Sequence, residues 1–292
     1  MNNDVQKINL DEYVQSGEGG QALTYTRKDN SSLAKLFMLS YGAETAQREF
    51  LVSKAVYEAG IPSPKPIRLV TDGERFGGEY ELIAGKRSYA RIISEEPEQL
   101  EPLTIRFAKL AKEIHGKAAD TEVFPDMKDV VRMWIEKSEC ITEPLRQRLL
   151  EALESIPSPK TYLHGDLHVG NIITNGTKEY WIDLGNFAWG APEWDFSMIY
   201  FTAFYMAPER TDHLFHLTPA TLQKHWALLI KTYYGFQTEE QLHDYEKHLL
   251  KFVALKLFYN FCKRYNGKGQ PVPQLEGMAN AFLNGIAPGL KV

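Results

Sequence analysis

The sequence has few cysteines, no long apolar run and no large excess of either charge. Its 292 residues include only two cysteines, Cys140 and Cys262, which are far apart and lack the spacing of a metal site. We therefore expect reduced thiols in a cytoplasmic protein. No apolar run approaches the roughly 18 residues that a membrane-spanning helix needs, so we expect no membrane span. Residues 1–11 are polar and predict no signal peptide.

The net charge of −5 is small for a chain of this length. We therefore expect neither a nucleic-acid partner nor binding to an anionic membrane. Hydrophobic residues make up 43% of the sequence, which is enough for a sizeable core in one large or two smaller domains.

The stretch 164–186 carries the strongest pattern in the chain. Two short apolar segments, 172–173 and 180–182, flank the pair Asn175-Gly176. This pair is typical of tight hairpin turns, because both residues tolerate a positive φ. The pattern therefore predicts a β-hairpin.

The predicted hairpin brings three polar side chains together. Asn171 comes just before its first strand and Asp183 just after its second, and a short loop holds Asp166 nearby. Mg²⁺ prefers hard oxygen ligands and takes few carboxylates from protein. We therefore predict Asn171 and Asp183 as metal ligands, with Asp166 as the base that receives a proton from an attacking hydroxyl. This spacing is typical of the catalytic and metal loops of phosphoryl transfer in kinases.

The motifs around these residues resemble a known family. H-G-D-L-H-x-x-N at 164–171, followed twelve residues later by the Asp of I-D-L-G, is similar to the aminoglycoside phosphotransferase and choline kinase group. These are small-molecule kinases with a protein-kinase-like fold, and Gly165 fits that branch because protein kinases usually carry Arg there. The block G-A-P-E-W-D-F-S at 190–197 extends the resemblance and implies that Asp195 braces the catalytic loop.

The resemblance implies an α+β, bilobal protein-kinase-like fold. Residues 1–85 would form a nucleotide-binding lobe with a five-stranded antiparallel sheet and one helix, and residues 86–292 a larger helical lobe for catalysis and substrate binding. ATP would lie in the cleft with Mg²⁺ bridging its phosphates, and a hydroxyl of a small molecule would attack the γ-phosphate. The patterns predict strands at 8–14, 22–26, 32–39, 67–71 and 78–83, and helices at 44–59, 102–117, 129–138, 144–156, after 195, 219–234, 239–265 and 273–286.

Three glycines, Gly17, Gly19 and Gly20, lie in the predicted turn between the first two strands. A glycine turn lets backbone amides approach phosphates without side-chain obstruction. Its position upstream of the catalytic motif favours that role over a plain turn. The spacing is not G-x-G-x-x-G, so we expect looser cover over the phosphates.

Lys35 is a lone lysine in the apolar strand predicted at 32–39. Such a lysine is uncommon unless it is paired or faces solvent. The functional interpretation is the lysine that clamps the α- and β-phosphates, with a glutamate of the next helix as partner. Glu49 is the expected partner, and Glu44 is the alternative.

The resemblance also implies that the Glu81 carbonyl and the Ile83 N–H bind adenine at the connection between the lobes. Gly77-Gly78 leaves that register open by a residue or two. His168 falls where protein kinases often carry a phosphate-contacting lysine, so it either contacts phosphate or braces the loop.

Two other classes remain open from the sequence. His164, Asp166 and His168 form H-x-D-x-H, which could serve a metal-dependent hydrolase. That interpretation leaves Asn171 and the hairpin unexplained. A catalytically inactive, nucleotide-binding kinase-like protein is the second alternative.

The acceptor substrate is not defined by any motif. An aminoglycoside, a choline-like molecule, a sugar and an amino alcohol are all open. Residues 201–260 hold six acids and six bases, so they show no acidic excess for a polycation. Aromatic side chains after residue 188 could form a cage for choline, although plain core is the simpler interpretation.

Overall fold

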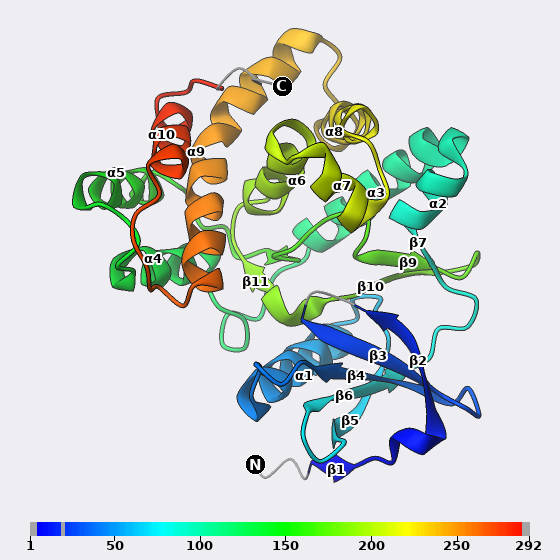
Figure 1. Cartoon of the computed structure of the whole chain (residues 1–292). Helices are drawn as coiled ribbons and strands as arrows, with labels where there is room; N and C mark the ends of the chain where they lie inside the picture. The colour runs from blue at the N-terminus through cyan, green and yellow to red at the C-terminus, as the bar shows by residue number, and fades with distance from the viewer. Residues whose placement is uncertain (1–4, 19–20, 288–292) are drawn as a thin grey trace. The chain divides into compact units, whose positions relative to one another are not determined.

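The chain folds into two compact units, seen in the computed structural model of Figure 1, which describes residues 5–18 and 21–287. The first unit comprises the residues up to Ser88 together with Asn171–Asn186, and the second comprises Tyr89–Gly170 and the residues from Phe187 onward. By contacts, the segment after Gly170 therefore belongs with the N-terminal part. The functional division at residue 85 stays a prediction.

A six-stranded sheet forms the core of the first unit, in the order β1-β5-β6-β4-β3-β2. Neighbouring strands are antiparallel, except β1, which runs parallel to β5. The strands are β1 (Gln6–Lys7), β2 (Tyr13–Glu18), β3 (Ala22–Arg27), β4 (Ser32–Phe37), β5 (Pro66–Thr71) and β6 (Phe76–Glu81). The prediction of five antiparallel strands therefore missed β1, because two residues are too few to show the alternation of a strand.

The strand predicted at 8–14 is wrong in its first half. A 3₁₀ turn, η1 (Leu10–Glu12), interrupts it, and the Asn9 side chain accepts a hydrogen bond from the Asp11 N–H at 3.0 Å. Asn and Asp favour such local turns because their side chains compete with strand pairing for backbone N–H groups. Strand β2 then begins at Tyr13.

The helix predicted at 44–59 is α1 (Ala43–Glu58). Its buried residues are Ala46, Phe50, Ser53 and Val56, one stripe at helical spacing. Leu51 is 45% exposed, and Lys54 lies on the solvent side.

The predicted hairpin is present as β9 (Ile172–Thr174) and β10 (Glu179–Trp181), joined to β7 (Arg87–Ser88) in a three-stranded antiparallel sheet. The connection differs from the expected turn, since only Gly176 of the pair has a positive φ, 89°. Four residues join the strands, and the Asn175 side chain accepts from the N–H groups of Thr177 and Lys178.

The second unit is mainly helical and is organised around the long helix α9 (Glu239–Arg264). This helix contacts α4, α5, α6, α8 and α10 (Figure 1). The other helices are α2 (Tyr89–Glu95), α3 (Leu100–His115), α4 (Met127–Lys137), α5 (Glu143–Glu154), α6 (Glu193–Tyr205), α7 (Pro208–Phe215), α8 (Pro219–Tyr234) and α10 (Pro273–Leu283), with a 3₁₀ turn η2 (Pro97–Gln99) before α3. A small sheet pairs β8 (Tyr162–Leu163) with β11 (Ala188–Trp189).

Two helices were not predicted, α2 and α7. His213 lies in α7, and His216 ends that helix in the left-handed region at φ 55°. Both helices are short, seven and eight residues, so a periodic pattern has little length in which to appear.

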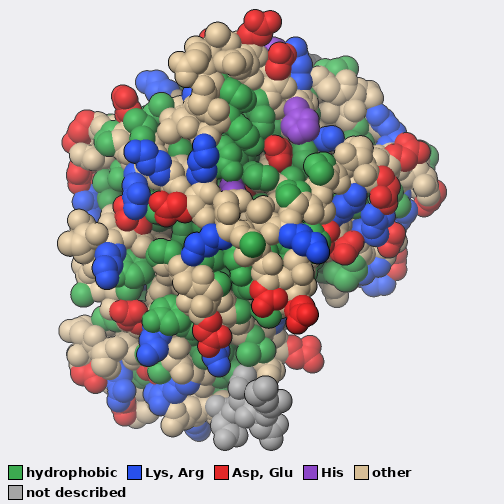
Figure 2. All heavy atoms as spheres, turned by 180° about the vertical axis from the view of Figure 1, so that it is seen from behind, with side chains coloured by type: hydrophobic (Ala, Val, Ile, Leu, Met, Phe, Trp, Pro, Cys, Tyr) green, Lys and Arg blue, Asp and Glu red, His purple; other side chains and the backbone are tan. Residues whose placement is uncertain are grey.

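Charged side chains of both signs are interspersed over the face drawn in Figure 2. This mixture agrees with the small net charge of the chain. Over the residues that the structure describes, no helix is both long and apolar enough to cross a bilayer.

Candidate active site

Lys35 occupies the middle of the six-stranded sheet in the first unit. It lies on β4, and its neighbours Ala34 and Leu36 are fully buried while its own side chain is 19% exposed. Strand register places Gly17, Thr24, Lys35 and Gly78 in one row across four strands. Successive residues alternate between the two faces of a strand, so Lys35 points away from the buried Ala34 and Leu36.

The Lys35 ammonium group joins two carboxylates of the first unit. Its Nζ lies 2.7 Å from Glu49 Oε1 and 2.6 Å from Asp183 Oδ1. Of the two glutamates considered from the sequence, Glu49 is therefore the observed partner, and Glu44 is exposed on the same helix. Burial by itself lowers the pKa of Lys35, but the carboxylates of Asp183 and Glu49 raise it above its usual value.

The segment after β10 is packed closely against α1. The 3₁₀ turn η3 (Leu184–Asn186) contacts that helix, and a Cβ built on Gly185 would lie 3.2 Å from Glu49 Oε2. The glycine of D-L-G thus allows close approach to the glutamate that pairs with Lys35. Asp183 itself has a φ of 57°, a left-handed conformation that non-glycine residues adopt rarely and that is enriched at functional sites.

Asn171 and Asp183 lie at the same open end of the hairpin, as the sequence predicts. The backbone N–H of Ile182 donates to the Asn171 carbonyl at 3.0 Å, just beyond the paired residues Ile172 and Trp181. The Asp183 side chain is 50% exposed, whereas Asn171 is buried. A solvent-accessible carboxylate and an amide oxygen are both ligand types that fit Mg²⁺.

The catalytic-loop motif lies in the second unit, where Asp195 holds its backbone. The two carboxylate oxygens of Asp195 accept hydrogen bonds from the N–H groups of His164, at 2.8 Å, and Gly165, at 2.7 Å. His115 Nε2 lies 3.1 Å from the same carboxylate. Although burial raises the pKa of a carboxyl group, His115 and the nearby His164 and Lys256 hold the pKa of Asp195 below its usual value. The bracing role expected for Asp195 is thus seen in its contacts.

Asp166 is half exposed, with 49% of its side-chain surface accessible. Its backbone N–H donates to His164 Nδ1 over a long 3.4 Å, and His168 Nε2 lies 4.0 Å from its Oδ2. His164 is fully buried, as a loop-holding residue should be. The roles of Asp166 as base and of His168 at phosphate stay predictions.

The geometry does not favour the zinc-type interpretation of H-x-D-x-H. His164 Nδ1 and His168 Nδ1 both accept backbone hydrogen bonds, from Asp166 and Gly170. His168 also packs edge-on against Phe215, with ring centroids 5.1 Å apart. Within residues 5–18 and 21–287, no group of three or more His, Cys, Asp or Glu side chains is placed to hold a metal ion.

The remaining nucleotide-site predictions fall at the edges of the first unit. Gly17 lies at an irregularity in the pairing of β2 with β3, where an added Cβ would lie 2.6 Å from Thr24 Oγ1. Gly19 and Gly20 lie outside the described residues. Glu81 ends β6, and Ile83 is buried two residues later. Their roles with phosphate and adenine stay predictions.

Lys256 is a residue that the sequence reasoning missed. It lies on α9, is only 2% exposed, and donates from Nζ to the Gly165 carbonyl oxygen at 2.9 Å. The available signal was a lone lysine in the apolar run from Phe252 to Phe258. Lysine is almost never fully buried unless it is paired, so that position could have been singled out.

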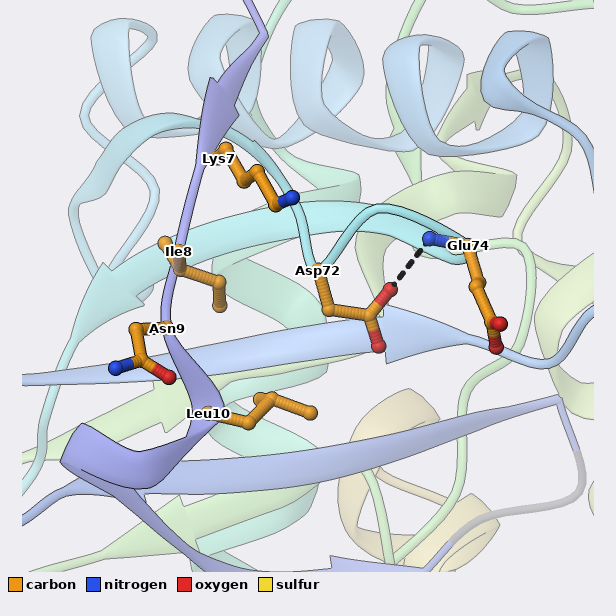
Figure 3. Close-up of a pocket in the computed structure, with 6 residues that line it drawn as sticks. All are labelled: Lys7, Ile8, Asn9, Leu10, Asp72 and Glu74. Carbon is orange, nitrogen blue, oxygen red and sulfur yellow. Dashed lines mark hydrogen bonds between the residues drawn. The ribbon is translucent and has the colours of Figure 1, made fainter.

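A separate hollow of about 580 Å³ lies in the first unit, at the start of the chain and the turn between β5 and β6 (Figure 3). Figure 3 shows Asp72 on that turn, where its Oδ1 accepts from the Glu74 N–H at 3.0 Å. The other lining residues are Lys7, Ile8, Asn9 and Leu10. None of the predicted site residues lines this hollow.

The sequence profile of the phosphotransferase enzyme family (APH) matches residues 14–227, and the chain belongs to this family. The resemblance found from the motifs is therefore confirmed. A comparison with curated protein sequences gives no match.

Solved structures of small-molecule kinases share the fold. A choline/ethanolamine kinase family protein from Mesorhizobium loti is 13% identical, with 93% of this chain and 85% of that chain covered at a TM-score of 0.57. The ADP-bound aminoglycoside phosphotransferase APH(2'')-Ib is 17% identical, with coverages of 94% and 92% and a TM-score of 0.54. A thermostable APH(4)-Ia mutant in complex with AMP-PNP and hygromycin B is 12% identical, with coverages of 96% and 95% and a TM-score of 0.59. The predicted kinase-like α+β fold is thus confirmed.

Proposed function

We propose that this protein transfers the γ-phosphate of ATP to a hydroxyl group of a small molecule. The observation that carries the proposal is the ion-paired set of the first unit, in which Lys35 joins Glu49 and Asp183. A lysine held by a helix glutamate beside a metal-binding aspartate is the arrangement that kinases use on nucleotide phosphates. Family membership and the related complexes with ADP and AMP-PNP support the same activity.

Each residue then has a defined task. Lys35 steadies the α- and β-phosphates, and Asn171 and Asp183 hold Mg²⁺, which neutralises phosphate charge when it is bound. Asp166 orients the acceptor hydroxyl and takes its proton. The acceptor oxygen forms a bond to the γ-phosphorus while the bond from that phosphorus to the bridging oxygen breaks, and ADP leaves with the electron pair.

The nucleotide is proposed to use backbone groups as well as side chains. The turn that carries Gly17, Gly19 and Gly20 covers the phosphates, and His168 contacts them. The Glu81 carbonyl and the Ile83 N–H bind adenine. These assignments rest on the family resemblance. The affinity of the purified chain for ADP is the first measurement that tests them.

The acceptor is proposed to be a hydroxyl-bearing small molecule. Of the aromatic side chains that could form a choline cage, three are buried, Trp194, Trp226 and Tyr200, and three are half-buried, Trp189, Phe204 and Tyr205. The Trp226 ring N–H donates to Glu246 Oε1 at 2.8 Å, so Trp226 is fixed in the core by a hydrogen bond as well as by packing. Sugars and amino alcohols therefore belong in the acceptor screen beside choline and aminoglycosides.

The test is turnover of ATP by the purified full chain against a panel of hydroxylated metabolites, with and without MgCl₂. We expect ADP and a phosphorylated product, identified by ³¹P NMR, only when Mg²⁺ is present. Asp166→Ala should lower turnover by roughly 10²–10⁴-fold, the contribution of a general base, while ADP affinity is retained. Asp244→Ala, an exposed position on α9, is the matched control. Unchanged turnover in Asp166→Ala would exclude its role as base, and ADP binding without any turnover would favour the inactive nucleotide-binding alternative.

A further inference from the structure

Lys256 occupies a place where a charged side chain is costly. It lies in the buried middle of α9, between Leu255 and Phe258, which are both fully buried. Removing an ammonium group from water is unfavourable unless hydrogen bonds or opposite charges compensate. Its polar contact at normal hydrogen-bond length is the Gly165 carbonyl oxygen at 2.9 Å, and Met127 Sδ lies 3.8 Å away.

The carbonyl that Lys256 contacts belongs to the peptide bond immediately before Asp166. Gly165 has a φ of 81°, a conformation that favours glycine, so the chain turns sharply there. The N–H side of Gly165 is fixed by Asp195 Oδ1 at 2.7 Å. Lys256 therefore holds the carbonyl of Gly165, while Asp195 holds its N–H. Together the two contacts fix the orientation of the Gly165–Asp166 peptide plane, and this plane sets the direction of the Asp166 side chain.

The hydrogen bond from the Asp166 N–H to His164 is long by comparison. The N–H reaches His164 Nδ1 only at 3.4 Å, near the limit for a hydrogen bond. A hydrogen bond from an ammonium group at 2.9 Å is charge-assisted and stronger than a neutral one. The carbonyl end of the Gly165–Asp166 peptide thus makes the shorter of these two hydrogen bonds.

The electrostatic surroundings agree with this geometry. Burial lowers the pKa of Lys256, while Tyr259, Asp195 and Asp166 oppose that change. The ammonium group also lies 5.3 Å from the centre of the Tyr259 ring. Asp166 is thus close enough for its charge to affect Lys256.

We propose that Lys256 is a positioning residue, which aims the Asp166 carboxylate by holding the Gly165 carbonyl. This inference rests on the proposed function, in which Asp166 is the base. Replacing the lysine by a neutral apolar side chain frees the peptide plane to rotate, and catalysis is sensitive to such misplacement of a reacting group.

The central variant is Lys256→Met, which keeps the length of the side chain and removes the donor. We expect kcat to fall by roughly 10–100-fold, the value of one charge-assisted hydrogen bond, while KM for ATP stays the same. The matched control is Lys247→Met, at an exposed position on the same helix. Removal of the donor leaves the buried Gly165 carbonyl without this hydrogen bond, so the free energy of unfolding should fall. The split between kcat and KM, measured on folded protein, distinguishes positioning from a structural role.

A double-mutant cycle tests whether Lys256 acts through Asp166. If it does, Lys256→Met should cause no further loss of turnover in an Asp166→Asn background. Hydrogen exchange of the 163–170 segment should also become faster in Lys256→Met and not in Lys247→Met. Lys256→Gln, whose shorter side chain carries only a neutral donor, is the second variant if Lys256→Met does not fold, and the same direction of change in kcat and in exchange is expected.

The outcomes separate the two proposals. Independent losses in the cycle, a kcat of Lys256→Met close to that of the wild type, or unchanged exchange of the 163–170 segment would each overturn the positioning role while wild-type turnover keeps the proposed function. Absence of turnover in the wild type would overturn the proposed function, and the positioning role with it, even if exchange of the segment still responds to Lys256.

Discussion

Lys35 Nζ lies 2.6 Å from Asp183 Oδ1, across 148 residues of sequence. The same nitrogen lies 2.7 Å from Glu49 Oε1, so one ammonium group joins β4, α1 and the end of the hairpin. Because both carboxylates attract it, its position is set before any nucleotide arrives. The two carboxylates that pair with Lys35 can be tested separately.

Glu49→Ala should weaken nucleotide binding because Lys35 loses the partner that orients it. We expect ADP affinity to fall by roughly 10–100-fold, the worth of a hydrogen bond to a charged group. Isothermal titration of the full chain with ADP and Mg²⁺ measures the change. Glu44→Ala, on the exposed side of the same helix, should leave the affinity unchanged. Equal losses in both variants would contradict the assignment of Glu49.

Asp183→Asn should remove the magnesium-dependent part of ADP binding. The amide keeps the shape of the side chain but loses the charge that a divalent cation requires. Thermal melting with ADP, measured with MgCl₂ or with EDTA, reports this part. In the wild type we expect ADP to raise the melting temperature more in MgCl₂ than in EDTA. An Asp183→Asn variant that responds to Mg²⁺ like Asp29→Asn, an exposed control in the same unit, would rule out the metal role.

Gly77→Ala should destabilise the first unit strongly. Gly77 pairs with Leu36, and a Cβ at this position would lie 1.8 Å from the Lys35 carbonyl oxygen. Relief of that clash requires the strands to move apart, at a cost of about 3 kcal/mol. Gly277→Ala is the matched control, since its added Cβ meets nothing within 4 Å in α10 and should stabilise by up to about 1 kcal/mol. Urea unfolding should show a lower free energy of unfolding for Gly77→Ala and an equal or higher one for Gly277→Ala. Equal changes in the two variants would contradict the close approach at Gly77.

The free energy of unfolding should fall in weak acid because His225 is buried in its neutral form. Its Nδ1 lies 2.8 Å from Thr104 Oγ1 between α3 and α8, and burial lowers its pKa from 6.5 to about 4. The unfolded chain therefore takes up a proton near pH 6.5 and the folded chain only near pH 4. The stabilisation is complete above pH 6.5 and is lost as the pH falls towards 4, a total of roughly 3 kcal/mol.

His225→Asn removes this titration and should flatten the dependence of unfolding free energy on pH between 6.5 and 4. The measurement is urea unfolding at several pH values in that window. Asp195, whose pKa is held below its usual value, titrates in both proteins, so the difference between the two curves isolates His225. Parallel curves for the wild type and the variant would refute the assignment.

The sequence predicts those parts of the molecule in which one local pattern decides the structure. The helix predicted at 219–234 is α8, and Asn171 and Asp183 meet at the hairpin end because strand pairing follows from alternation and a turn signal. The Lys35–Glu49 pair was predicted from the role that a strand lysine with a helix glutamate partner has in kinases, with Glu44 as the alternative. Local signals were sufficient for the helix and the hairpin, and the ion pair also needed the kinase motif.

The misses arise where tertiary packing decides. Gly77-Gly78 left the register of its strand open by a residue or two, but the structure shows that β4 passes too close to Gly77 for a side chain. Lys256 gave no sign of its partner, since Gly165 lies 91 residues away and is contacted through its backbone. Asn175 contributes a side-chain hydrogen-bond acceptor to its turn rather than a positive φ, a choice that the dipeptide alone does not reveal.

The route of the chain also bears on its synthesis. Trp181 donates its N–H to the Pro62 carbonyl at 2.9 Å, and η3 packs on α1, so Asn171–Asn186 completes the first unit. A ribosome releases residues in order, and all of Tyr89–Gly170 leaves the exit tunnel before that segment does. The part of the protein that is translated first therefore acquires the last of its own native contacts only after all of Tyr89–Gly170 has been synthesised.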